Sequence, residues 1–79
     1  MPLKYVSGEE ILKGDHVRLD GSTGVVEFVA DPENPTAETE WYIQEYGGGV
    51  MILDALIGSV FDGDPQENDC LEFVRRAED

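Results

Sequence analysis

Short runs of alternating apolar and polar residues, separated by glycines and prolines, make up most of this chain. Val17 and Leu19 share one face of such a run, and Gly21-Ser22-Thr23-Gly24 follows it as a turn. Alternation with a period of two is typical of half-buried strands, and a glycine turn between two such runs is typical of a β-hairpin. The pattern predicts five strands, over residues 15–20, 25–30, 40–46, 50–55 and 71–76, with 56–61 extending the fourth past Gly58.

The length of the chain limits how these strands are arranged. Its 79 residues bury a single core, because a chain of this size cannot divide its apolar surface between two cores. We therefore expect one domain over residues 1–79. Five short strands favour a mainly β fold, a strongly bent sheet or small barrel whose closure removes open strand edges. Ser7-Gly8-Glu9-Glu10 matches a capping box, which predicts a short helical turn over residues 9–12.

Alternation also predicts the core. Val26 and Phe28 are two positions apart, so they share a face of their strand. The expected core residues are Val17, Leu19, Val26, Phe28, Trp41, Ile43, Ile52, Leu71 and Phe73. Residues 31–39 and 62–69 are expected to be exposed acidic loops, since their prolines cannot donate to a strand ladder. Gly47-Gly48-Gly49 is expected to form a flexible turn.

The charge of the chain is strongly acidic and unevenly distributed. Eighteen acidic residues against five basic ones give a net charge of −13. Residues 19–74 hold thirteen of these carboxylates and no lysine or arginine. Such a field repels phosphates and anionic lipids, so it disfavours binding to nucleic acid or to a membrane surface. A basic protein surface is the natural complement. The alternative is that the acidity serves only solubility, or reflects life at high salt.

Other classes are excluded by composition. No apolar run is long enough for a membrane-spanning helix or a secretory signal, and we expect a cytoplasmic protein. Cys70 is the only cysteine, so an internal disulfide and a cysteine-based zinc site are excluded. We expect Cys70 to be a small, partly buried thiol.

Residues 13–29 contain Gly-Asp-x-Val-x-Leu from Gly14, a glycine turn, and Gly-x-Val-x-x-Val from Gly24. This pattern resembles the opening hairpin of SH3-like barrels of the KOW and Tudor type. The resemblance implies a five-stranded SH3-like barrel. KOW domains contact RNA or proteins through basic and aromatic residues, and the basic ones are missing here. Tudor-like domains hold methylated lysine or arginine in aromatic cages. Trp41, Tyr42 and Tyr46 could supply rings, although Trp41 and Tyr42 are expected to face opposite ways on one strand.

No catalytic or metal site is predicted. His16 is the only histidine and lies on the polar face of its strand. The candidate nucleophiles are Ser7, Ser22, Ser59 and Cys70. None of them has the sequence spacing of a catalytic triad or of a nucleophile elbow. Residues 62–69 alternate oxygen ligands, but Glu67 and Phe73 stand where a calcium loop needs glycine and glutamate. We therefore expect no enzyme activity, no cofactor and no bound metal.

The remaining candidate is a protein-binding surface around the aromatic run. Tyr42, Gln44 and Tyr46 form one row, and tyrosine is enriched at protein interfaces; the alternative is that these rings pack under a neighbouring loop. The predicted partner-binding residues are Tyr42, Tyr46, Glu38, Glu40 and Glu45. They indicate a non-enzymatic acidic module, with an inhibitor or immunity-type protein that covers a basic surface as its sharper form. The alternative is a Tudor-like accessory domain that recognises a peptide or a modified side chain.

Overall fold

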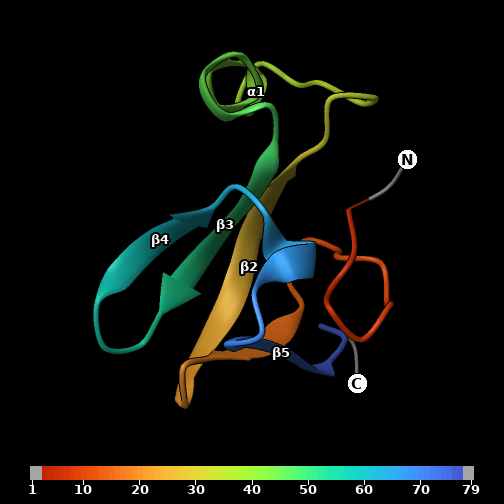
Figure 1. Cartoon of the computed structure of the whole chain (residues 1–79). Coiled ribbons are helices and arrows are strands. Elements are labelled where there is room, and N and C mark those ends of the chain that lie inside the picture. Colours follow the sequence, from red (N-terminus) through yellow and green to blue (C-terminus); the bar gives the residue numbers. More distant parts are fainter. Residues whose placement is uncertain (1–2, 78–79) are drawn as a thin grey trace.

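Residues 3–77 are described by a computed structural model of the chain (Figure 1). One antiparallel sheet runs in the order β4-β3-β2-β1-β5. Its strands are β1 (His16–Leu19), β2 (Ser22–Ala30), β3 (Gly49–Asp54), β4 (Gly58–Asp62) and β5 (Leu71–Arg75). A helix, α1 (Glu40–Tyr46), connects β2 to β3, and a 3-10 turn, η1 (Pro65–Glu67), connects β4 to β5. The predicted mainly β fold, with five antiparallel strands in one bent sheet, is confirmed.

Four of the five strands match predicted segments, and two strand assignments are wrong. Residues 40–46 form the helix α1 instead of the third strand. The expected extension of the fourth strand past Gly58 is wrong as well, because the chain turns back after β3 and forms β4 as a separate strand. The side chain of Asp54 holds this turn. It is buried and accepts hydrogen bonds from the backbone N–H of Leu56 (2.8 Å) and of Ile57 (3.2 Å) and from the Ser22 hydroxyl (3.0 Å).

A β-bulge in β2 separates Val26 from Phe28. Val26 pairs with Ile52, whereas Phe28, two residues later on β2, pairs with Met51, which is only one residue away from Ile52 on β3. Because neighbouring residues of a strand point to opposite faces, Val26 faces the core and Phe28 faces the other side of the sheet. We call that other side, which carries Val25, Phe28, Met51 and Leu53, the outer face. The prediction that Val26 and Phe28 share a face is wrong for this reason.

The core lies against the inner face of the sheet. Its buried members are Tyr5, Ile11, Val17, Val26, Val50, Ile52 and Leu71, with Leu3, Leu19, Val29 and Phe73 packed at its edge. Four predicted core residues, Val17, Val26, Ile52 and Leu71, are therefore fully buried. Trp41 is 55% exposed, and Ile43 is half-buried on α1. These two do not belong to the core, because the segment that carries them is a helix.

The segment before β1 closes the core with a buried carboxylate. Asp15 is 1% exposed and its Oδ2 accepts hydrogen bonds from the Tyr5 hydroxyl (2.7 Å), the Leu12 N–H (2.9 Å) and Arg76 Nη1 (2.9 Å). Arg76 also donates to the carbonyl of Glu10 (2.7 Å). Burial, together with the hydrogen bond to Asp15, raises the pKa of Tyr5 far above its ordinary value. These bonds tie the beginning of the described chain to its end.

The capping box does not begin a helix. The Ser7 hydroxyl donates to the Glu9 side chain, and this bond lowers the pKa of the exposed Glu9 carboxyl. Residues 6–8 form a turn, and an isolated bridge joins Lys4 to Glu10. The predicted helical turn over residues 9–12 is therefore wrong. Among residues 3–77, no helix is long and apolar enough to cross a membrane.

Candidate protein-binding surface

Helix α1 is bounded by a threonine turn and a glycine. The Thr36 N–H donates to the Thr39 hydroxyl oxygen (3.0 Å), and the Thr39 N–H donates to the Thr36 carbonyl (3.1 Å). At the other end Gly47 is left-handed, with φ of 80°, and donates its N–H to the Ile43 carbonyl (2.8 Å). Threonine before a helix and glycine after it are ordinary helix boundaries. Both were visible in the sequence, together with acidic residues near the helix start.

The glycines after α1 are packed rather than flexible. Gly48 and Gly49 are buried, and β3 begins at Gly49. A Cβ on Gly49, whose φ is +144°, would lie 2.3 Å from the Asp62 carbonyl oxygen and 2.7 Å from the Phe61 ring. Only glycine allows this close approach between β3 and β4. The expected flexible turn is therefore a fixed link that holds α1 against the sheet.

Aromatic rings attach α1 to the outer face. Tyr42 lies 5.1 Å from Phe28 and 4.8 Å from Phe61, measured between ring centroids. Tyr46 lies 4.9 Å from Phe61. Phe28 and Phe61 both pair with Met51, so they occupy one cross-strand row beneath the helix. Tyr42 is thus the ring that packs inward, against the sheet and not under a loop, while Tyr46 remains 56% exposed.

Trp41 joins the same group of rings. Its centroid lies 5.0 Å from Tyr42 and 5.9 Å from Tyr46, in edge-to-face arrangements of 87° and 75°. The prediction that Trp41 and Tyr42 face opposite ways is wrong, because consecutive helix residues differ in direction by about 100° and not 180°. We call Trp41, Tyr42, Tyr46, Phe28 and Phe61 the aromatic cluster. Its exposed part is Trp41 and Tyr46, each more than half accessible.

The three predicted glutamates lie on or beside α1 and are all exposed. Glu45 is four residues after Trp41, so the two side chains are neighbours on the helix surface. Glu38 lies in the turn before the helix, three residues ahead of Trp41. Glu40 is two residues before Tyr42, and helical spacing therefore directs it to roughly the opposite side of α1. From this spacing we expect Glu45 to be the glutamate beside the Trp41 ring.

The exposed rings of Trp41 and Tyr46 are distant in sequence from every basic residue of the chain. Within residues 3–77, the cation–π contact that the structure records is Arg76 over Phe73, at 4.8 Å. The basic residues all lie before residue 19 or after residue 74 in the sequence. The exposed rings of Trp41 and Tyr46 are thus set in a purely acidic stretch of chain. Electron-rich ring faces and carboxylates both attract cations.

The other candidate residues are scattered. His16 lies on the outer face, and the Ser22 hydroxyl is used by Asp54. Cys70 is exposed, so the expectation of a partly buried thiol is wrong. In residues 62–69 the Asp62 carboxylate accepts bonds from the Asp64 N–H (2.9 Å) and the Asn68 amide (2.8 Å). Among residues 3–77, no group of three or more His, Cys, Asp or Glu side chains is arranged to hold a metal ion.

No family model, no curated protein and no solved structure matches this chain.

Proposed function

We propose that this protein is a non-enzymatic acidic module that binds a basic protein surface, with α1 as its contact element. One observation carries the proposal: Trp41 and Tyr46 are 55% and 56% exposed on a helix that is flanked by carboxylates. Large exposed rings are the side chains that most often anchor protein interfaces. The surrounding acid selects a partner of the opposite charge.

The rings and the carboxylates have different roles in this proposal. Trp41 and Tyr46 bury apolar area and receive a basic side chain of the partner on their faces. Glu38 and Glu45 attract the partner from a distance and remain at the hydrated edge of the contact. Tyr42, Phe28 and Phe61 hold α1 in place before binding, so little conformational freedom is lost when the partner binds. A partner that uses its basic surface for nucleic acid would be inhibited.

The test is capture of a partner from native lysate at low and high salt, repeated with two variants. Trp41→Ala combined with Tyr46→Ala removes the exposed rings, and the matched control, Leu56→Ser, changes an 82% exposed residue away from α1. We expect the same basic protein to be captured by the wild type and by Leu56→Ser, and to be lost with the double variant. Capture that is equal for all three proteins would contradict the role of α1.

A second candidate is recognition of a modified lysine or arginine, as in a Tudor-like accessory domain. Three rings that lie together favour it, since the ring centroids of Trp41, Tyr42 and Tyr46 are all within 6.4 Å of one another. Trp41 is the only tryptophan, so its fluorescence reports occupancy directly. Titration with peptides that contain lysine or trimethyl-lysine separates the two functions. A preference of ten-fold or more for trimethyl-lysine supports the second candidate, and equal affinity supports the first.

A further inference from the structure

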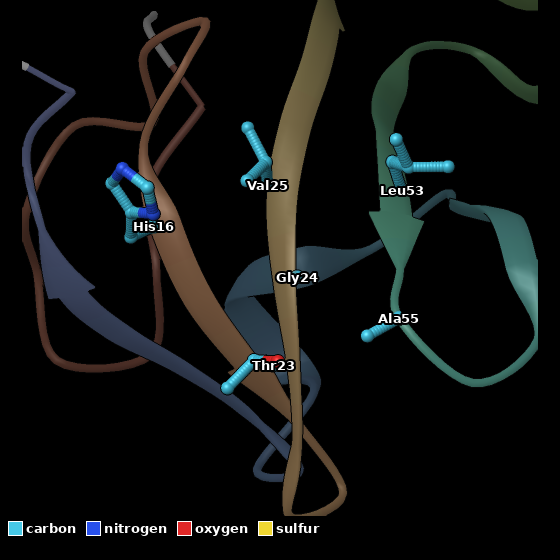
Figure 2. A pocket seen from close by; sticks show the side chains of 6 residues that line it. All are labelled: His16, Thr23, Gly24, Val25, Leu53 and Ala55. Carbon is cyan, nitrogen blue, oxygen red and sulfur yellow. The ribbon is translucent and has the colours of Figure 1, made fainter.

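A part of the outer face lies beyond the aromatic cluster and forms a hollow. Figure 2 shows His16 on β1, Val25 on β2 and Leu53 on β3 next to one another, with Thr23 and Ala55 lower in the view. His16 pairs with Val25 and Val25 pairs with Leu53, so the three form one cross-strand row. Together with Gly24 these residues line a hollow of about 280 Å³, which we call the sheet-face hollow: His16, Thr23, Gly24, Val25, Leu53 and Ala55.

The size and lining of the hollow indicate what it can receive. Pockets for drug-sized ligands usually measure about 300–1,000 Å³, so this one is small. Its walls are mainly the apolar side chains of Val25, Leu53 and Ala55, and Leu53 is 50% exposed. One or two apolar side chains of another chain would fill this volume and cover Leu53. A row of side chains across three strands also suits an extended segment, whose alternate side chains point one way.

The charges around the hollow select the occupant. At the β4 end of the row, Ser59 pairs with Leu53 and donates its hydroxyl to Glu27 Oε1 (2.7 Å), which fixes that carboxylate beside the row. At the β1 end, Arg18 forms an ion pair with Glu72, with 3.8 Å between Arg18 Nη1 and Glu72 Oε2. A second copy of the chain would also carry a charge of −13 and would be repelled. The same field disfavours nucleic acid and anionic lipid.

We propose that the sheet-face hollow is a second docking site, which binds an extended segment of a basic protein in which apolar and basic residues alternate. An apolar side chain of the segment enters between Val25 and Leu53, and a neighbouring basic side chain meets Glu27. This site is separate from the exposed rings of α1. It can therefore bind whether or not α1 does, and the two sites need not contact the same partner.

Two residues that occur once in the chain distinguish the sites. His16 is the only histidine and lines the hollow, whereas Trp41 is the only tryptophan and lies on α1. The probe is a synthetic Lys-Leu-Lys-Leu-Lys peptide with blocked ends, and the readouts are the imidazole proton signals of His16 and the fluorescence of Trp41. We expect saturable shifts of the His16 signals. A Lys-Ser-Lys-Ser-Lys peptide, which has the same charge, should bind at least ten-fold more weakly.

Variants of single positions complete the test. Leu53→Ser should weaken binding of the Leu-containing peptide about ten-fold. Glu27→Gln should weaken binding of the same peptide chiefly at low salt, because the substitution removes only a charge. Leu56→Ser, which lies outside the hollow, should leave the affinity unchanged. Equal binding of the two peptides, or His16 signals that Leu53→Ser does not alter, would overturn the proposal. Shifts that appear on concentrating the protein without peptide would overturn it too, by assigning the face to a second copy. A change in Trp41 fluorescence alone would support the α1 site and contradict this one.

Discussion

Replacing Asp15 with alanine removes the acceptor of three hydrogen bonds at once. Oδ2 of Asp15 accepts from Tyr5, Leu12 and Arg76 at 2.7–2.9 Å, and the carboxylate is 1% exposed. In the variant the buried Tyr5 hydroxyl has no partner, which costs about 1–3 kcal/mol. Breaking a buried ion pair typically costs about 3–5 kcal/mol. Because Arg76 is 34% exposed and is hydrated in the variant, we expect a total loss near 3 kcal/mol.

Urea unfolding measures this loss, and a second variant locates it. Tyr5→Phe keeps the ring and its contact with Phe73, 5.2 Å between centroids, but removes the donor, so it should cost about 1 kcal/mol. In a double-mutant cycle the two changes should be clearly less than additive, because both remove the same bond. A loss below about 1 kcal/mol for Asp15→Ala, or full additivity, would refute the claim that this carboxylate fastens the two ends of the described chain.

Three further predictions concern the outer face, the turn between β3 and β4, and the binding of nucleic acid. Phe28→Ala should cost about 2 kcal/mol in denaturant melts, less than the 3–5 kcal/mol of a fully buried phenylalanine, because the ring is half-buried under Tyr42; a loss of 4 kcal/mol or more would contradict the bulge register. Hydrogen bonds from Leu56, Ser22 and Ile57 lower the pKa of Asp54, so its contribution to stability is complete above about pH 4 and is lost as the pH falls through the lowered folded-state pKa. The difference in unfolding free energy between wild type and Asp54→Asn should therefore narrow as denaturant melts are repeated at lower pH. A difference that widens would contradict the stabilising role of the charged Asp54 carboxylate. Mobility-shift assays at physiological salt should detect no binding to duplex DNA or RNA, since a surface without a basic footprint has no counterions to release; a clear shift at micromolar protein would overturn the electrostatic argument.

The sequence was sufficient for the strands whose side-chain pattern is local. Val17 and Leu19 correctly predicted the β1–β2 hairpin, and Leu71 was correctly predicted at the core end of β5. The predicted turn over residues 21–24 is wrong, because the turn is Asp20-Gly21, both with positive φ, and Ser22, Thr23 and Gly24 already pair within β2. The strand count was right although two assignments were wrong, because α1 was counted as a strand and β4 was merged with β3. Residues 40–46 contain tryptophan, tyrosine and isoleucine, which favour strands. The threonine turn and Gly47 at the two ends outweigh that preference.

What the sequence could not give depends on contacts between distant residues. The bulge that turns Phe28 to the outer face is defined only by pairing with β3. Residues 55–57 contain no proline or glycine, and the β3–β4 turn is held by the bonds of the Asp54 carboxylate to Leu56 and Ile57, with Gly58, at φ of 85°, as the residue that pairs with Asp54. The Asp15–Arg76 bond spans 61 positions. For the candidate surface, Tyr42 and Tyr46 were expected on one side, and they are, but through helical rather than strand spacing.

The most direct test of the central claim is the kinetics of a captured basic partner on immobilised wild-type protein and variants. Removing the exposed rings, by Trp41→Ala with Tyr46→Ala, should speed dissociation by about thirty-fold or more at every salt concentration, because one interface anchor typically costs at least ~2 kcal/mol and the costs of two neighbouring anchors do not simply add. Neutralising Glu38 and Glu45 should instead slow association, chiefly at low salt. Dissociation that is unchanged in the ring variant, or salt-independent effects of equal size from both sets of changes, would contradict the account.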